Sequence, residues 1–533
     1  MFKKILLYIS LFSIGSAFSQ EVSYHVSNWS VYEFLDEMAN EKLISLNSAI
    51  KPYSRKFIAE ALKELSDKKE LLNTRQQKEL EFFLRDFNKE LMPDKNFKKR
   101  LDMYYYKDSL FTFSINPCAG AQFFFNDSGM VYDRWIGADA FAYIGKHLGI
   151  YASLRDHRES QRLSEPTYLT LRQGACYILD GKAGEYDETR GGIIYSWNWG
   201  SFGLVKDQFV WGDNYHGANI FSGRQPSFGQ FKLHIKPVKW LDFNYINGWL
   251  ISGIIDSSQS YLVNNGSGNT LRTVYHSKYL AANMFTITLW KGFNFSFGNS
   301  IIYSDYYNPV YLIPVLFYKS VDHTYNNVGS QSSAQNAQIF ANFSSRQIKN
   351  VHLYSSVFCD EVGLAQMFSS NHHNYISIKA GSKISNILNK NITFTVEYTR
   401  NNPMVYQNAV PVINFESNNY NLGNYLVDNS GEIFLSLSFK PVNGLVCTTS
   451  FLQAKKGVNY LKLTGTEEWG LPYLNSVVWE NKTISVSANY NIVNDGYLFV
   501  EYSHSNIFGP SEYTPSYFQG IKNTVSIGTI FGF

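Results

Sequence analysis

The chain has 533 residues, of which 44% are hydrophobic, 17% are aromatic and only 17% are charged. The low charge and the many aromatic rings exclude a disordered chain. The 47 basic and 44 acidic residues leave a formal net charge of +3, so the composition gives no indication of nucleic-acid binding.

The N-terminus has the pattern of a secretory signal peptide over 1–19. Two lysines precede an apolar run over 5–18, and Ala17 and Ser19 occupy the −3 and −1 positions of a cleavage site before Gln20. The remaining chain has no run of about 18 apolar residues. We therefore expect an exported protein that could enter a membrane only with strands.

Residues 20–107 are expected to form a small helical domain. Between residues 21 and 107 there are 16 basic and 15 acidic residues, a much denser charge than in the rest of the chain. Three groups of capping residues are each followed by apolar residues at helical spacing. The expected caps are Ser30 with Glu33, Ser54, and Thr74 with Gln77, and the first helix should bury Val31, Phe34, Leu35 and Met38.

Residues 108–533 alternate apolar and polar side chains with a period of two, which is typical of strands with one apolar face. Each run is about 9–11 residues long, which is the length that a tilted membrane strand needs. Examples begin at Leu241, Phe293, Ile392, Ile433 and Ile484. A region of this length would make about 16–18 strands, which is enough to enclose a lumen.

The connections between these runs are of two sizes. Turn residues occupy 236–239, 290–292, 440–444 and 494–496, and long polar segments occupy 156–167, 256–273, 322–336 and 401–430. Short turns at one rim and long loops at the other are typical of outer-membrane barrels. We therefore predict a mainly β protein, a large antiparallel transmembrane β-barrel preceded by a small α-helical domain.

The last predicted strand covers 523–533 and ends on an aromatic residue. Phe531 and Phe533 are expected to act as the membrane-assembly signal, because the final strand must pair with the first to remove both sheet edges. Outer-membrane lipids and, during biogenesis, the barrel-assembly machinery are therefore expected partners.

Catalytic motifs are absent from the sequence. It contains no HExxH, GxSxG, P-loop or GxGxxG. The four cysteines have no CxxC or Cys/His spacing, and they could form disulfides in an oxidising compartment or stand as isolated small apolar residues. We predict no catalytic residue, no metal, no cofactor and no enzymatic activity; an outer-membrane hydrolase is the weakest of the hypotheses.

Tryptophans and charged residues gather in one short stretch. Aromatic rings stack on the C–H faces of sugars, while carboxylates and guanidinium groups pair with hydroxyls and uronic-acid carboxylates. Alternatively, these tryptophans belong to the aromatic girdle at the membrane interface and the charges line a wet lumen. The candidate polysaccharide-binding residues are Trp197, Trp199, Asp207, Trp211, Asp213 and Arg224.

Three regions of the chain resemble the Wzi-like capsule assembly family of outer-membrane proteins. They contain Tyr-Glu-Phe-Leu-Asp at 32–36, Arg-Trp-Ile-Gly-Ala at 134–138, and Phe-Gly-Leu-Val-Lys-Asp at 202–207 followed by Phe-Ser-Gly-Arg-Gln-Pro at 221–226. The resemblance implies a β-barrel with an appended helical domain and a role in retaining or organising surface polysaccharide. It supplies no site residues.

These observations lead to one expected function and one alternative. We expect a non-enzymatic outer-membrane protein that binds, anchors or helps assemble capsular or extracellular polysaccharide at the cell surface. The alternative is a porin or sugar-transport channel, which would share every barrel feature. A plugged lumen would favour the first and an open lumen the second.

Overall fold

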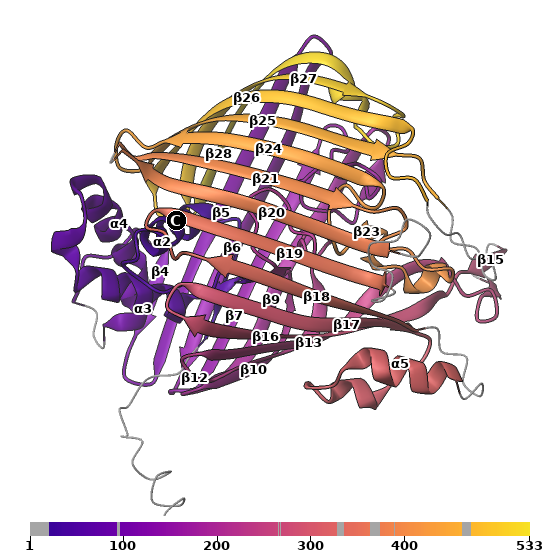
Figure 1. Cartoon of the computed structure of the whole chain (residues 1–533), viewed down its shortest axis with the longest axis horizontal. Helices are drawn as coiled ribbons and strands as arrows, with labels where there is room; N and C mark the ends of the chain where they lie inside the picture. Colours follow the sequence, from indigo (N-terminus) through magenta and orange to yellow (C-terminus); the bar gives the residue numbers. More distant parts are fainter. Residues whose placement is uncertain are drawn as a thin grey trace, which may run out of the picture.

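The structure is a computed structural model that describes residues 21–92, 96–264, 266, 268–327, 335–362, 374–388, 390–460 and 471–532. The predicted signal peptide and Phe533 lie outside the described residues. The fold is a large barrel with three helices at one end (Figure 1). None of the described helices is long and apolar enough to cross a membrane.

The barrel wall consists of 18 antiparallel strands within the described residues, which confirms the predicted fold class. They are β5 (Phe111–Asn126), β6 (Gly129–Ile144), β7 (Leu148–Glu159), β9 (Ala183–Trp197), β10 (Gly200–Asp207), β12 (Phe228–Val238), β13 (Leu241–Ile255), β16 (Tyr275–Trp290), β17 (Phe293–Ser304), β18 (Gln335–Ser345), β19 (Val351–Val362), β20 (Asn374–Ile387), β21 (Ile392–Asn401), β24 (Ser430–Phe439), β25 (Leu445–Gly457), β26 (Val477–Val493), β27 (Gly496–Phe508) and β28 (Gly520–Gly532). Short strands β4 (Tyr104–Lys107) and β8 (Ile178–Asp180) extend the wall at β5 and β9.

The barrel closes where the last strand meets the first long one. β28 pairs antiparallel with β5, from Val525 opposite Phe125 to Gly532 opposite Cys118. Pairing of the last strand with β5 joins the two ends of the described wall, which a lipid environment requires. Phe531 lies on the outer face of this last strand and is half exposed.

The alternating pattern separates an outer wall from a lumen. On β24, Ile433, Leu437 and Phe439 are more than two-fifths exposed on the outer wall, whereas Glu432 is buried and faces inward. On β21, Glu397 and its polar neighbours are likewise buried toward the lumen. The five predicted runs are therefore confirmed as strands, and β21 and β24 place apolar side chains outward and polar ones inward.

The helices α2 (Trp29–Asn40), α3 (Arg55–Ser66) and α4 (Thr74–Leu91) pack on one another. Val31, Phe34, Leu35 and Met38 are at most 1% exposed, as predicted. Ser54 caps α3 by accepting the Phe57 N–H, also as predicted.

Two of the predicted helix caps were wrong. Helix α2 begins after Asn28 without any side-chain cap, because Ser30 is already inside the helix. The capping box of α4 uses Asn73 and Gln76, one residue earlier than Thr74 and Gln77. Asn and Thr are both good N-cap residues, so a cap one position earlier satisfies the same spacing rule.

The two rims differ as expected. Short turns join β16 to β17, β24 to β25 and β26 to β27 at the predicted positions. The turn between β12 and β13 lies at 239–240 rather than 236–239, because β12 continues to Val238. The helices lie at this short-turn rim, where Asn494 donates to the carbonyl of Phe82 at 3.1 Å (Figure 1). The connections of the opposite rim contain the hairpin of β14 (Tyr261–Asn264) and β15 (Asn269–Arg272), the turn η2 (Pro309–Leu312), α5 (Tyr318–Asn327) and η5 (Ser516–Phe518).

Two long connections fold back from this rim into the lumen. One is 208–227, with β11 (Val210–Trp211); the other is 402–429, with η4 (Pro411–Ile413), β22 (Glu416–Ser417) and β23 (Tyr420–Asn421). We call them the first and second plug segments. Their apolar side chains form one core with inward residues of the wall: Phe209, Trp211, Ile220, Phe221, Met404, Val405, Tyr406, Phe415 and Leu422 pack against Ile246, Leu250, Leu280, Met284, Phe340 and Phe358.

The helical region also reaches into this core. Its short strands are β1 (Ser23–Tyr24), β2 (Ile50–Lys51) and β3 (Tyr53–Ser54), and η1 (Lys69–Leu71) links α3 to α4. β2 pairs with β11 of the first plug segment, with Ile50 opposite Trp211. The lumen is therefore filled from both ends by folded chain.

Candidate functional site

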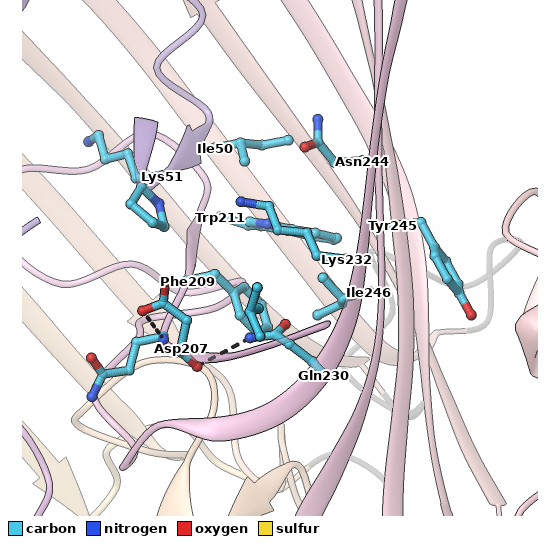
Figure 2. A pocket seen from close by; sticks show the side chains of 13 residues that line it. Ile50, Lys51, Asp207, Phe209, Trp211, Gln230, Lys232, Asn244, Tyr245 and Ile246 are labelled. Carbon is cyan, nitrogen blue, oxygen red and sulfur yellow. Dashed lines mark hydrogen bonds between the residues drawn. The ribbon is translucent and has the colours of Figure 1, made fainter. Parts of the chain in front are cut away.

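Trp211 lies at the centre of the plug core. Its ring centroid is 5.6 Å from that of Phe209, 5.2 Å from Phe221 and 5.9 Å from Phe340 on the wall. Figure 2 shows this residue between β2 and the inner wall. The void beside it has about 10 Å³, close to the lower limit for one water molecule. Trp211 is 1% exposed and therefore has no surface on which a sugar ring could stack.

Asp213 follows in the same plug segment and is also fully enclosed. Its Oδ2 accepts a 2.7 Å hydrogen bond from the Asn342 amide, and Ser48 donates to its Oδ1. The Asp213 N–H in turn donates to the Asn342 Oδ1 at 3.0 Å. Asp213 thus fastens the plug to β18 and to the helical region.

Asp207 stands at the end of β10, where the plug begins. Its carboxylate accepts a 2.6 Å hydrogen bond from the Tyr151 hydroxyl and a 2.9 Å bond from the Gln208 N–H. Gln230 on β12 donates to the Asp207 carbonyl at 3.2 Å (Figure 2). These contacts fix the direction in which the chain enters the lumen.

Arg224 is a buried cation with which no described carboxylate pairs. Its guanidinium donates to the carbonyls of Tyr168 at 2.5 Å and Glu165 at 3.5 Å, and lies 5.2 Å from the Tyr420 ring centroid. The Nε has no hydrogen-bond partner among the described residues. Burial lowers the pKa of Arg224 to about 10, so the side chain remains a cation at neutral pH.

A cavity of about 170 Å³ lies beside this cation. The two plug segments and the 160–177 connection surround it, and its polar lining includes Gln173, Gln208, Ser222 and Arg224. Leu171 lines the same cavity and is 43% exposed on the long-loop side. The cavity thus combines an unpaired cation with amide and hydroxyl groups.

Trp197 and Trp199 lie elsewhere, at the short-turn rim. Their rings meet edge to face with centroids 5.2 Å apart. Trp199 occupies the turn between β9 and β10, and Trp240 and Trp290 stand at the next short turns, all about half exposed. A row of tryptophans at successive turns matches an interfacial girdle.

The structure therefore does not bring the six candidate residues together. Trp211, Asp213 and Arg224 share the first plug segment inside the lumen with Asp207 at its start, while Trp197 and Trp199 lie on the wall at the turn between β9 and β10. A second cavity, of about 310 Å³, lies beside these two tryptophans between α3 and strands β9, β10, β12 and β13. Its charged lining includes Glu21, whose pKa is about 2, because hydrogen bonds and charges from His234 outweigh the effect of burial.

A chain of buried polar contacts through the lumen was not predicted from the sequence. Asp36 of α2 forms ion pairs with Arg346 at 2.7 Å and with Lys383 at 3.1 Å. Tyr215 of the first plug segment donates to Asp36 at 2.7 Å, and its N–H donates to Glu397 at 2.8 Å. The chain links α2, the wall and the plug.

The same chain continues toward the long-loop side. Lys379 lies 3.1 Å from Glu397 and donates to the carbonyl of His216 at 3.0 Å. His216 lies 3.1 Å from Glu432, which also accepts from Tyr425 of the second plug segment. No local sequence signal could have found these residues, because the partners are far apart in the chain.

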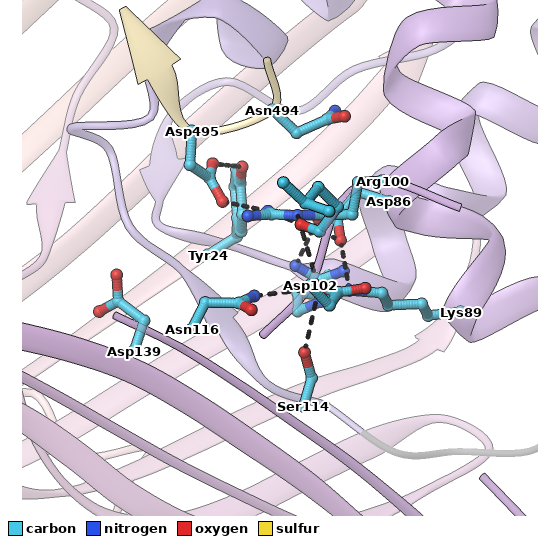
Figure 3. A network of polar contacts seen from close by, with 12 residues as sticks. Tyr24, Asp86, Lys89, Arg100, Asp102, Ser114, Asn116, Asp139, Asn494 and Asp495 are labelled. Atoms are coloured by element: carbon cyan, nitrogen blue, oxygen red, sulfur yellow. Dashed lines mark hydrogen bonds and ion pairs between the residues drawn. The ribbon is translucent and has the colours of Figure 1, made fainter. Parts of the chain in front are cut away.

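A second polar network holds α4 against the barrel at another sector of the rim (Figure 3). Lys89 lies 3.0 Å from Asp86 and 2.7 Å from Asp102, and Arg100 pairs with Asp495 in the turn between β26 and β27. Tyr24 donates to the same Asp495 at 2.9 Å. Both networks are more consistent with fixed docking than with a catalytic centre. Among the described residues, no group of three or more His, Cys, Asp and Glu side chains could hold a metal ion.

Comparison with solved structures identifies the architecture. The structure aligns with Wzi of Escherichia coli, an outer-membrane protein involved in group 1 capsule assembly and a carbohydrate-binding β-barrel, over 96% of this chain and 99% of that chain, with a TM-score of 0.57 and 10% sequence identity. The protein has the Wzi fold. OprD of Pseudomonas aeruginosa is less similar, with a TM-score of 0.40 and 9% identity over 81% of this chain and 97% of that chain. No known family and no curated protein matches the sequence.

Proposed function

We propose that this protein is a non-enzymatic outer-membrane protein that binds or anchors capsular or extracellular polysaccharide at the cell surface. The closed barrel with its apolar outer band supports the location. Wzi of Escherichia coli, which shares this fold, is a carbohydrate-binding β-barrel, and this supports the polysaccharide role.

The filled lumen is the observation that carries this proposal. A porin needs a continuous aqueous path, whereas here the two plug segments and β2 form one apolar core with the inner wall. Opening such a path would expose this core to water, at about 25 cal/mol for each Å² of apolar surface. A barrel with this interior is better suited to present a fixed surface than to conduct solutes.

The contact site that we propose is the 170 Å³ cavity around Arg224. A buried guanidinium without a carboxylate partner favours an anion, and a uronic-acid carboxylate would supply one by a charge-assisted bidentate bond. The Gln173 Nε2 is occupied by carbonyls of the first plug segment, and its Oε1 can accept a hydrogen bond from a sugar hydroxyl. In this proposal Trp211 and Asp213 hold the plug that carries Arg224, and Trp197 and Trp199 face the membrane interface.

The test compares Arg224→Gln with Arg272→Gln in cells that lack the wild-type protein. Arg272 is a matched control, because its guanidinium also lies over a tyrosine ring, 5.8 Å from the Tyr261 centroid, but on the exposed β14–β15 hairpin. At equal surface levels, Arg224→Gln should shift polysaccharide from the cells to the medium without changing the total amount, and Arg272→Gln should not. Full retention by a folded Arg224→Gln variant would contradict the site.

A further inference from the structure

The connection between β17 and β18 follows a different course from the plug segments. Its described part, 305–327, folds down over the outside of the barrel, and α5 lies outside the wall beside β17 and β18 (Figure 1). The hydrogen bonds of this connection also place it on the outside of the wall. Ala282 and Met284 belong to the lumen core, so Asn283 between them faces outward, and its amide donates to the carbonyls of Pro314 and Leu316, both at 2.9 Å.

The outer wall beneath this connection carries buried amide side chains among apolar residues. Asn247, Asn283, Asn299 and Gln335 lie on outward-facing positions of β13, β16, β17 and β18, and none is more than 7% exposed. The Tyr245 hydroxyl donates to the carbonyl of Tyr311 at 2.7 Å, and Asn299 accepts the Tyr318 N–H at 2.6 Å. Side chains of the wall thus form hydrogen bonds with backbone N–H and carbonyl groups of this irregular segment.

The opposite side of the segment is apolar. Residues 306–318 contain no charged residue between Asp305 and Lys319. The side chains directed away from the barrel are Leu312, Ile313, Val315 and Phe317, which are between 42% and 62% exposed. A connection surrounded by water would not be expected to present four adjacent large apolar side chains.

The height of the segment can be read from β16. Trp290 stands in the short-turn girdle, and Asn283 is seven residues further along a strand that rises about 3.3 Å per residue at a tilt of about 40°. Asn283 is therefore roughly 18 Å above the girdle, inside an apolar band about 25 Å tall. The atoms of Pro314 and Leu316 that it binds lie at the same level.

We propose that 306–318 is a membrane anchor embedded in the outer leaflet, where it contacts the acyl chains of the surrounding lipid. An irregular backbone is tolerated in hydrocarbon only where its polar groups are satisfied by protein, and the outward amides of Asn283 and Asn299 do this here. Leu312, Ile313, Val315 and Phe317 then extend the lipid-facing surface of the wall. The proposal depends on the outer-membrane location but not on polysaccharide binding.

Depth-dependent quenching tests this proposal. A bimane probe is placed at Val315→Cys, in a chain whose four native cysteines are replaced by serine, and the folded barrel is reconstituted in phosphatidylcholine vesicles. Leu437→Cys on the outer wall is the lipid-facing control, and Leu262→Cys on the exposed β14–β15 hairpin is the aqueous control. The Val315 probe should be quenched severalfold by lipids with brominated acyl chains, as Leu437 is, and protected from iodide.

Two results would overturn the anchor. Iodide quenching like that at Leu262 would place the segment in water, and protection from both quenchers would mean that protein covers it. An experiment without substitutions guards against misfolding of the cysteine-free chain: lipids with a photoreactive diazirine in the acyl chain should form adducts on 306–318 of the wild-type barrel. Adducts on the outer wall strands but none on 306–318 would equally contradict the proposal.

Discussion

Asp36 and Arg346 form a buried ion pair, 2.7 Å between Oδ1 and Nη2, although 310 residues separate them in the chain. Arg346 follows β18 at the short-turn rim, and Asp36 lies on α2. The same guanidinium donates to Asn40 at 2.8 Å and to Ser48 at 3.0 Å. One arginine of the barrel thus holds three positions of the helical region.

Asp36→Asn is expected to weaken the docking of the helices. Removing one partner leaves Arg346 and Lys383 buried without full compensation, which costs about 3–5 kcal/mol for a buried pair. Limited proteolysis of the folded barrel should therefore cleave 21–107 at least tenfold faster. Glu81→Gln, which breaks the exposed Lys69–Glu81 pair inside the helical region, should change nothing; equal rates for the two variants would contradict the docking role.

The contribution of Asp36 should depend on pH with a defined sign. Burial alone would raise the pKa of Asp36, but the charges of Lys383 and Arg346 outweigh it and hold the pKa well below its usual range. A depressed pKa gives stability that is present above the unfolded value of about 3.9 and is lost as pH falls. The ratio of cleavage rates for wild type and Asp36→Asn, measured with an acid-stable protease, should stay constant from about pH 7 to 5 and shrink below about pH 4. If the two cleavage rates were already equal at pH 6, a titrating group other than Asp36 would be responsible.

Phe531→Ser is expected to impair barrel assembly. Phe531 faces outward on the strand that closes the sheet, so the change removes apolar surface from the last strand. Heat-modifiable gel migration should show less folded barrel in the membrane. Phe508→Ser, at the long-loop end of β27 and 70% exposed, is the matched control and should assemble normally. Phe533 lies outside the described residues, and its role in barrel assembly remains a prediction.

The tryptophans at the short turns should support stability rather than sugar binding. Trp199→Ser and Trp240→Ser should lower the temperature at which the barrel unfolds in a gel-shift assay, because both rings are placed for the membrane interface. Polysaccharide retention at matched protein levels should stay unchanged. Loss of retention by Trp199→Ser alone would instead support a sugar-stacking role for that residue.

The wall of the barrel could be predicted from the sequence because its signal is local. Alternating runs such as the one from Ile433 to Phe439 depend only on which side chains face lipid, and turn residues such as Asn494 and Asp495 mark the short rim directly. The burial of Phe34 and Leu35 followed in the same way from helical spacing.

The interior could not be predicted because its contacts are distant and its polarity is mixed. Trp211 and Arg224 look alike in the sequence as parts of a sugar-binding stretch, yet one packs in an apolar core and the other lines a cavity. Asn283 looks like an ordinary lumen residue, and only the strand parity shows that it faces outward. Such roles depend on which segment folds back onto which face.

Conductance across a planar bilayer tests most directly whether this barrel is a binding protein rather than a channel. With the lumen filled by the two plug segments, the purified folded protein should give no steady ion current at moderate voltage. Deletion of 209–226, which leaves only the two end residues of the first plug segment, should produce open-channel steps in the same assay. A large, steady current through the wild-type protein would contradict the account.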